Sequence, residues 1–189
     1  MFTIRRATPA DLPAIQNANL TNLPENYSMQ LYYYHLILWP TTTFVAVNKE
    51  GKIVGYCLTK IEDDESHPVV TGQVTSISVI RTYRKLGIAT KLLRASESSM
   101  IETYGAKAMM LQVRISNTAA LHMYEKTFGF KITRTAKKYY LDGEDALILT
   151  HDFTMDTLIN KEKSSPILDK WKEEMAKSEN EKVKKEESA

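Results

Sequence analysis

The sequence predicts an α/β protein in which helices cover one sheet. Residues 74–80 alternate apolar and polar side chains, which is typical of a half-buried strand. From Gly87 to about Tyr104 the apolar residues instead recur every three or four positions, which predicts an amphipathic helix that Gly105 ends. With 189 residues, 43% of them hydrophobic, the chain can bury one core.

The other elements follow from similar local patterns. Thr8, Pro9 and Asp11 predict a helix start, with Thr8 as the cap, Pro9 at the first helical position and Asp11 favourably placed against the helix dipole. The remaining elements expected are strands at 2–6, 43–47, 53–61, 73–79, 109–113, 130–135 and 146–150, and helices near 29–37 and 118–127. Residues 48–51 form the turn of a hairpin, and an acidic loop occupies 62–66.

Two regions of different composition divide the chain. Residues 1–153 carry all of these elements and are expected to form one domain. Within the remaining residues, 154–189, those at 161–187 are mostly Lys, Glu, Asp and Ser, so they cannot build a packed core alone. The sequence predicts a charged tail, either disordered or a lone helix, and a weak apolar stripe containing Trp171 leaves a docking peptide open.

Composition excludes several classes of protein. The net charge of +2 and a pI near 8.5 do not favour specific nucleic-acid binding. The single cysteine, Cys57, lies in an apolar run and is expected to be a buried strand residue in a reducing compartment. No apolar stretch approaches the roughly 20 residues that span a bilayer, and no signal peptide is evident. We therefore expect a soluble protein without membrane contact, located in the cytoplasm and with the nucleus also open.

A basic turn joins the strand at 74–80 to the helix that follows. Residues 84–89 fit the pattern Arg/Gln-x-x-Gly-x-Gly/Ala. The first turn of a helix has N–H groups without helical partners and partial positive charge, so it can hold a phosphate. Gly87 allows close approach of the backbone, Arg84 and Lys85 add charge, and Ala89 is small. No P-loop or dinucleotide-binding pattern occurs, so the turn predicts a different pyrophosphate ligand.

A second motif lies downstream, from Asn117 through Tyr124 to Gly129 and Phe130. Together the two motifs resemble those of the GNAT acetyltransferase superfamily. The resemblance implies the GNAT fold, a mixed and mostly antiparallel central sheet flanked by helices, and acetyl-CoA as co-substrate. The residues it assigns to acetyl-CoA binding are Ile77, Ser78, Val79, Arg84, Lys85, Leu86, Gly87, Ile88, Ala89, Thr90, Asn117 and Tyr124.

Residues 1–153 further resemble the catalytic subunits of NatA-type N-terminal acetyltransferases. The resemblance rests on segments at 23–27, 32–35, 39–40, 51–56, 113–117 and 138–145. It implies transfer of acetyl to the α-amino group of nascent polypeptides, with Ser, Ala, Thr or Gly termini preferred in the complex and acidic termini by the subunit alone. It also implies a large helical-repeat auxiliary subunit, through which the protein contacts the ribosome. The expected partner surface, unless these residues simply cover the sheet, is formed by Ile15, Leu20, Leu31, Leu36, Ile37 and Trp39.

The acceptor side of the site needs a neutral amine. Because an α-amino group has a pKa of about 8, a carboxylate acting through water suffices to deprotonate it. The resemblance assigns this role to Glu25, although an ordinary loop or helix-cap acid remains the alternative. It places Leu23, Pro24, Tyr27, Tyr139 and Tyr140 around the substrate.

The remaining roles concern Arg114, Tyr140, Tyr124 and Asn117. Arg114 is expected to hold the substrate loop through Glu25, or to be a surface residue at a strand end. Tyr140 can bond the peptide backbone, or Tyr139 and Tyr140 are both ordinary strand aromatics. Tyr124 can protonate the leaving thiolate, or its ring can be core packing. Asn117 is expected to bond the pantetheine arm, to cap the following helix, or both.

The reaction implied is direct attack in a ternary complex. The thioester oxygen is expected to meet a main-chain N–H near Val79, where strands of the family splay. Cys57 has no activating partner visible in the sequence, and the four histidines lack the spacing of metal ligands, so we expect neither an acyl-enzyme nor a metal. Glu144 and Asp145 are expected to be loop residues. Two alternatives stay open: a GNAT enzyme acting on lysine or small-molecule amines, and an inactive acetyl-CoA-binding subunit.

Overall fold

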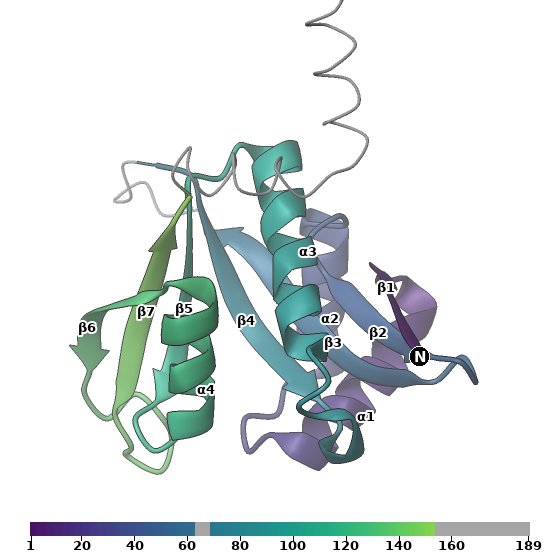
Figure 1. The fold of residues 1–189 in the computed structure, drawn as a ribbon, viewed down its shortest axis with the longest axis horizontal. Helices are drawn as coiled ribbons and strands as arrows, with labels where there is room; N and C mark the ends of the chain where they lie inside the picture. The colour runs from purple at the N-terminus through teal and green to yellow at the C-terminus, as the bar shows by residue number, and fades with distance from the viewer. Residues whose placement is uncertain (63–68, 154–189) are drawn as a thin grey trace, which may run out of the picture. The chain divides into compact units, whose positions relative to one another are not determined.

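A seven-stranded mixed sheet organises the residues that the computed structural model describes, 1–62 and 69–153 (Figure 1). The strands follow the spatial order β1 (Phe2–Arg6), β2 (Phe44–Asn48), β3 (Ile53–Glu62), β4 (Thr71–Val79), β5 (Ala108–Arg114), β7 (Ala146–Asp152) and β6 (Lys131–Ala136). All neighbours are antiparallel except β4 and β5, which are parallel. This arrangement confirms the predicted fold class, and each expected strand is present.

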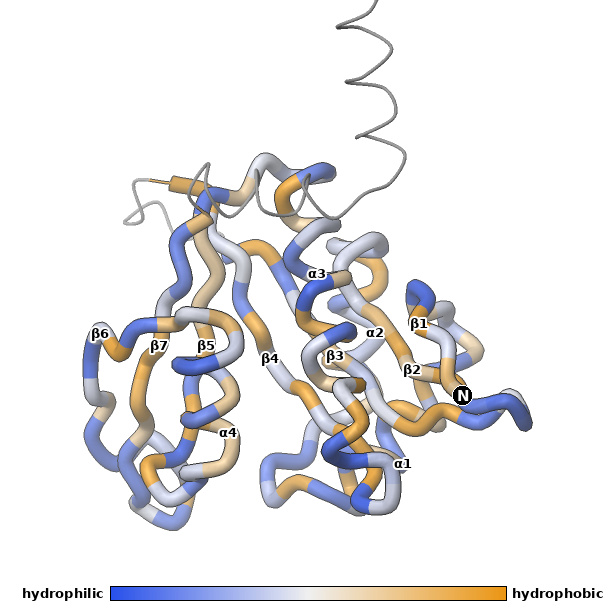
Figure 2. The backbone as a smooth tube through the Cα atoms, in the orientation of Figure 1, coloured by the Kyte–Doolittle hydropathy of each residue, from blue (hydrophilic) through white to orange (hydrophobic). Residues whose placement is uncertain are grey.

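Helices cover both faces of this sheet. The helices α1 (Leu12–Asn22) and α2 (Met29–Leu38) lie behind the sheet in Figure 1, whereas α3 (Ile88–Tyr104) and α4 (Thr118–His122) lie in front. Leu12, Ile15, Tyr32 and Tyr56 are fully buried in the core between α1, α2 and the sheet. Figure 2 shows the hydrophobic residues concentrated along the central strands. Because Ile15 is in this core, its assignment to a partner surface was wrong.

The first helix begins differently from the prediction. Pro9–Asp11 form a turn of 3-10 helix, and α1 proper begins at Leu12. Asp11 Oδ2 accepts bonds from the N–H and the hydroxyl of Thr8, both at 2.8 Å. Arg5 on β1 donates to both carboxylate oxygens of Asp11, at 2.7 and 2.8 Å. Asp11 therefore ties the edge strand to the start of the helix, in addition to its expected position against the dipole.

The pairing of Asp11 with Arg5 makes stability depend on pH. The hydrogen bonds from Arg5 lower the pKa of Asp11 from 3.8 to about 2, so the carboxylate stabilises the fold above pH 4 and loses this effect as the pH falls toward 2. Asp11→Asn should lower the free energy of unfolding at pH 7 by about 1–2 kcal/mol. Urea unfolding of both proteins from pH 7 to pH 2 measures this difference, which should shrink below pH 4. A difference that stays constant with pH would contradict the assignment.

The helix predicted at 118–127 is interrupted. It consists of α4 followed by a π-helix, Met123–Phe128, that ends at Gly129 with φ of 74°. A π-helix widens the turn by one residue and is frequent at functional sites. The predicted helix is confirmed in its extent, but its second half is a π-helix, which the period of apolar residues does not distinguish from an α-helix over six residues.

The remaining expectations concern the acidic loop at 62–66, the tail at 154–189 and membrane-spanning helices. The acidic loop lies largely, and the tail at 154–189 entirely, outside the described residues. Among the residues described, none of the helices is both long and apolar enough to cross a membrane.

Candidate active site

The parallel strands β4 and β5 separate at the centre of the sheet. Their pairing ends at Val74 and Leu111, and both strands continue beyond that point without facing each other. Thr75, the next residue of β4, is the extra residue of a β-bulge, since Leu58 pairs with Ser76 and Thr59 with Val74. The bulge bends β4 where the strands diverge, which opens the sheet (Figure 1).

The separation exposes main-chain groups of β4. The N–H of Ile80 bonds the carbonyl of Val54 on β3, at 2.9 Å. Main-chain groups alternate in direction along an antiparallel strand, so those of Ile77 and Val79 are directed away from β3 and toward the opening. The carbonyl of Val79 accordingly accepts a bond from Arg84 Nε, at 2.9 Å. The N–H of Val79 is therefore directed toward the opening, and its contact with the thioester oxygen stays a prediction.

The turn at 84–89 has the geometry of an anion site. Gly87 is the N-cap of α3 with φ of 75°, and Lys85 also has a positive φ, of 62°. No side chain caps the helix, and the first helical bond runs from Lys91 N–H to Gly87 carbonyl. The preceding N–H groups, those of Ile88, Ala89 and Thr90, are therefore available to a phosphate.

Arg84, which was expected to face a phosphate, forms hydrogen bonds inside the protein. Besides Val79, its guanidinium bonds Asn22 Oδ1 at the end of α1, at 3.2 Å. Its predicted contact with a phosphate therefore competes with two bonds inside the protein. Arg84, Lys85 and Leu86 are all exposed on the turn.

A cleft of about 680 Å³ occupies the opening of the sheet. Four parts of the chain form its walls: the loop after α1, the diverging halves of β4 and β5, the segment from Asn117 to Tyr124, and the loop between β6 and β7. The predicted site residues that line it are Leu23, Pro24, Glu25, Tyr27, Ile77, Arg114, Asn117, Tyr124, Tyr139 and Tyr140. Segments more than 100 residues apart in the sequence thus meet around one cavity.

Arg114, at the end of β5, joins the walls of this cleft. Its Nε and Nη2 donate to Glu25 Oε1 at 2.8 and 2.6 Å, which confirms the predicted pairing. Its Nη1 donates to Asp142 and Glu144, at 2.8 and 2.6 Å, and its guanidinium lies 3.9 Å from the centre of the Tyr140 ring. One guanidinium among three carboxylates leaves a net negative cluster, which favours a cationic substrate group such as an ammonium.

The electrostatics of the cluster keep the carboxylates of Asp142 and Glu144 ionised. Hydrogen bonds from Ser116, together with Arg114, lower the pKa of Glu144 to about 2. The N–H of Glu144 and the guanidinium of Arg114 lower the pKa of Asp142. Both bonds to Glu25 go to Oε1, so Oε2 is the oxygen that Arg114 leaves open for a proton or a water.

The buried residue Asn19, which was not predicted from the sequence, anchors the loop that carries Glu25. Asn19 on α1 donates to the carbonyl of Glu25 at 2.9 Å and to the hydroxyl of Tyr56 at 3.1 Å. Tyr56 in turn shares a hydrogen bond of 2.7 Å with Ser76, which lines the cleft. Asn19 lies one turn after the apolar Ile15 on the buried face, and a polar residue at that position was the available signal.

Tyr124 lies in the π-helix at the inner end of the cleft. Its side chain is buried, its ring meets that of Phe130 with centroids 5.7 Å apart, and its carbonyl accepts the N–H of Phe130 at 3.0 Å. Burial raises the pKa of its phenol, so the phenol stays protonated and can donate a proton. The predicted core packing is confirmed; the ring also lines the cleft, and protonation of the leaving thiolate by Tyr124 stays a prediction.

Cys57 and Asn117 match their predicted surroundings. Cys57 is fully buried on β3, and burial raises the pKa of its thiol to about 12, so it is not a ready nucleophile. Asn117 Oδ1 accepts the N–H of Ala120 at 3.2 Å, which confirms the predicted cap of α4.

Tyr139 and Tyr140 lie in the loop between β6 and β7, so the alternative that they are strand aromatics was wrong.

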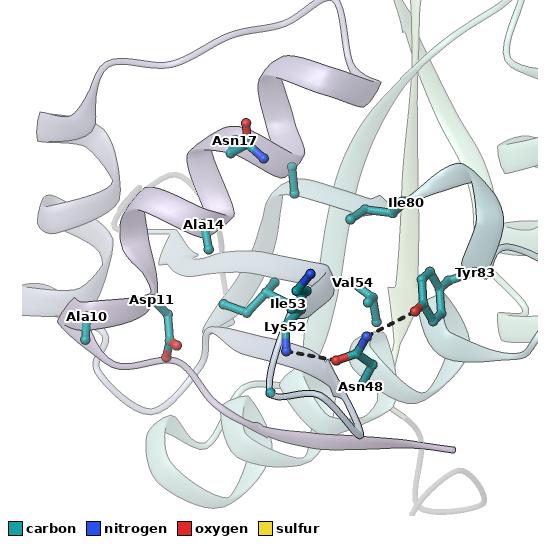
Figure 3. A pocket seen from close by; sticks show the side chains of 12 residues that line it. Ala10, Asp11, Ala14, Asn17, Asn48, Lys52, Ile53, Val54, Ile80 and Tyr83 are labelled. Carbon is teal, nitrogen blue, oxygen red and sulfur yellow. Dashed lines mark hydrogen bonds between the residues drawn. The ribbon is translucent and has the colours of Figure 1, made fainter.

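A second cavity, of about 510 Å³, lies between α1 and the β2–β3 turn (Figure 3). Asn48 bonds the Tyr83 hydroxyl at 3.0 Å and the Lys52 N–H at 2.8 Å, and Asp11 is paired with Arg5. Because these polar groups already have partners, we assign no activity to this cavity. Within the described part of the chain, no three His, Cys, Asp or Glu residues gather as metal ligands.

Comparisons with known proteins agree with this site. Residues 12–130 match the model of the acetyltransferase (GNAT) family. The chain therefore belongs to the GNAT family of acetyltransferases, enzymes that use acetyl-CoA.

More specific similarity is to N-terminal acetyltransferases. The chain is 47% identical over 151 residues to "N-terminal acetyltransferase A complex catalytic subunit ard1" of Schizosaccharomyces pombe, covering 80% of this chain and 85% of that one. It is 49% identical over 146 residues to "N-terminal acetyltransferase A complex catalytic subunit NAA10" of Arabidopsis thaliana, covering 77% and 75%. Its fold matches the "NatC complex bound to Gag peptide and CoA" with a TM-score of 0.74 and 28% identity, covering 81% of this chain and 99% of that one.

Proposed function

We propose that this protein transfers the acetyl group of acetyl-CoA to the α-amino group of polypeptides, as the catalytic subunit of a NatA-type complex. The observation that carries the proposal is the cleft in which Glu25, Arg114 and Tyr140 meet opposite the opened edge of β4. Its walls admit an extended peptide end, and its net negative cluster attracts an ammonium.

Direct attack in a ternary complex assigns one role to each group. Glu25 accepts the proton of the α-ammonium, directly or through a water, and the neutral amine attacks the thioester carbon. The N–H near Val79 stabilises the carbonyl oxygen as it gains charge. The C–S bond breaks as the C–N bond forms, and Tyr124 donates its phenolic proton to the departing thiolate. The second proton, which the attacking nitrogen loses as the amide forms, passes through water to the Tyr124 phenolate and restores the phenol.

The other residues position the two substrates. The turn at 84–90, with Ile77, Ser78 and Asn117, holds acetyl-CoA. The loop at 23–27 surrounds the first residue of the peptide, and the loop carrying Tyr139 and Tyr140 covers its backbone. Because Arg114 fixes Glu25, we assign it a positioning role rather than a chemical one.

The outer face of α2 is the surface we propose for a helical-repeat auxiliary subunit. Tyr33, Tyr34, Ile37 and Leu38 are exposed there, Ile37 to 72%, and Leu20 on α1 is 57% exposed. Contiguous apolar side chains of this kind mark interaction surfaces. We propose that this subunit brings the enzyme to the ribosome, in the cytoplasm, and that its docking shifts the preference from acidic first residues to Ser, Ala, Thr or Gly.

Acetyl transfer to a panel of peptides tests the proposal. The peptides differ only in the first residue, share an internal lysine, and include one with a blocked amino terminus. We expect transfer only to free α-amines, and a shift from acidic to small first residues when the auxiliary subunit is added. Acetylation of lysine in the blocked peptide would overturn the acceptor assignment, and acetyl-CoA binding without transfer would indicate an inactive subunit.

A further inference from the structure

A buried histidine outside the predicted site contacts the wall of the cleft. His35 lies on the inner face of α2 and is 2% exposed. Its Nε2 is 2.8 Å from the hydroxyl of Thr75, the bulge residue of β4 that lines the cleft. Its Nδ1 is 2.9 Å from the carbonyl of Leu31, one turn earlier in the same helix.

These two contacts determine the direction of each hydrogen bond. A carbonyl can only accept, so the proton of the neutral ring is on Nδ1 and is donated to Leu31. Nε2 is then an acceptor, and the Thr75 hydroxyl must donate to it. Burial lowers the pKa of His35, with Lys60 as a smaller contribution, which keeps the ring neutral. The orientation of the Thr75 side chain is therefore set by α2.

Thr75 transmits this constraint to the substrate loop. Its carbonyl accepts a hydrogen bond of 3.4 Å from the hydroxyl of Tyr27, a wall of the cleft. A bulge residue lacks a regular cross-strand partner, so its conformation depends on such side-chain contacts more than that of its neighbours. His35, Thr75 and Tyr27 thus form a continuous chain of contacts from α2 to the peptide pocket.

We propose that His35 and Thr75 are a positioning pair that shapes the acceptor-peptide pocket through the bulge of β4 and Tyr27. Neither residue exchanges a proton with the substrate. The inference rests on the proposed function, because it takes Tyr27 as a wall of the peptide pocket. It predicts an effect on peptide affinity rather than on acetyl-CoA binding or on the chemical step.

The test compares variants by steady-state kinetics, using the acceptor peptide that the wild-type protein acetylates. Thr75→Val removes the hydroxyl at constant shape, and His35→Phe keeps a ring but removes the acceptor. Each should raise the KM for the peptide about 3- to 10-fold, with kcat and the KM for acetyl-CoA within about twofold of wild type. His35→Gln, whose amide oxygen can accept the Thr75 hydroxyl, should recover part of the loss.

A double variant and a control separate positioning from folding. His35→Phe with Thr75→Val should raise the peptide KM no further than the worse single variant, because both remove the same interaction. The control is Thr59→Val on β3, which removes a buried hydroxyl that donates to the Thr42 carbonyl at 2.7 Å. It should lower the melting temperature without changing the peptide KM.

The outcomes separate the positioning role of His35 and Thr75 from the proposed acetyltransferase function. If the wild-type protein acetylates peptides and the His35 and Thr75 variants change only the melting temperature, the positioning role is overturned and the proposed function stands. If the wild-type protein acetylates neither α-amines nor lysines, the proposed function fails first and the peptide pocket with it. A raised peptide KM that Thr59→Val does not reproduce supports the pair.

Discussion

Glu25→Gln is expected to lower kcat for peptide acetylation by about 10²- to 10⁴-fold at pH 7, the usual contribution of a general base. The amide keeps the shape of the side chain and an oxygen that can accept the two bonds Arg114 donates to Oε1. It cannot take a proton at Oε2. Acetyl-CoA binding, measured by calorimetry, should be unchanged because the cofactor turn lies on another element.

The pH profile of Glu25→Gln distinguishes a base from a positioning group. An α-ammonium has a pKa of about 8, so above pH 8 the substrate amine is already neutral and needs no base. The deficit of the variant should therefore be largest near pH 6.5 and shrink toward pH 9. A deficit that is independent of pH would show that Glu25 positions the substrate and does not act as a base. A deficit that persists to pH 9 only with lysine substrates would reflect the higher pKa of the lysine amine, near 10.4.

A matched control for Glu25→Gln comes from the same guanidinium. Asp142 also accepts a bond from Arg114, but its side chain is 61% exposed and does not line the cleft. Asp142→Asn should change kcat by less than about threefold, because an exposed ion pair contributes little. An equal loss in both variants would show that the cluster as a whole, and not the carboxylate of Glu25, supports turnover.

The sequence predicted the parts of this site that depend on local pattern. The strand, the turn with Gly87 and the amphipathic helix form one continuous unit, so periodicity and the glycine position sufficed. The same reasoning located the cap at Asn117 and the buried position of Cys57. Resemblance to a family then brought Glu25, Arg114 and Tyr140 together, and the structure places these three around one cleft.

Other features could not be predicted because they depend on tertiary contacts. The bulge at Thr75 exists only relative to β3, and its hydroxyl has a partner only because α2 crosses that face. Arg84 was expected to face a phosphate, but Asn22, 62 residues earlier, offers its guanidinium an acceptor. Glu144 was expected to be a loop residue, and it is one, yet the fold of the β6–β7 loop brings it to Arg114. Spacing along the chain carries no information on such pairs.

Gly87→Val is expected to weaken acetyl-CoA binding at least about 100-fold, because several charge-assisted hydrogen bonds from the N–H groups of the turn depend on close approach. Gly87 has φ of 75°, a region that a β-branched residue rarely adopts. An added Cβ would meet no protein atom, since nothing lies within 4 Å of its ideal position. The loss would therefore arise in the ligand site and in the turn itself. Calorimetric titration with acetyl-CoA measures it.

Backbone strain alone must be separated from loss of the anion site, and the chain contains a matched position for this purpose. Gly51, in the β2–β3 turn, has φ of 78° and also has nothing within 4 Å of its Cβ position. Gly51→Val should therefore carry a similar strain, of about 1–3 kcal/mol, while leaving acetyl-CoA affinity within about twofold of wild type. If both variants lose stability equally and only Gly87→Val loses acetyl-CoA binding, the turn before α3 holds the ligand. If the two variants instead bind acetyl-CoA with equal affinity, Gly87 is not part of the acetyl-CoA site, because its position in the turn before α3 would then make no difference to binding.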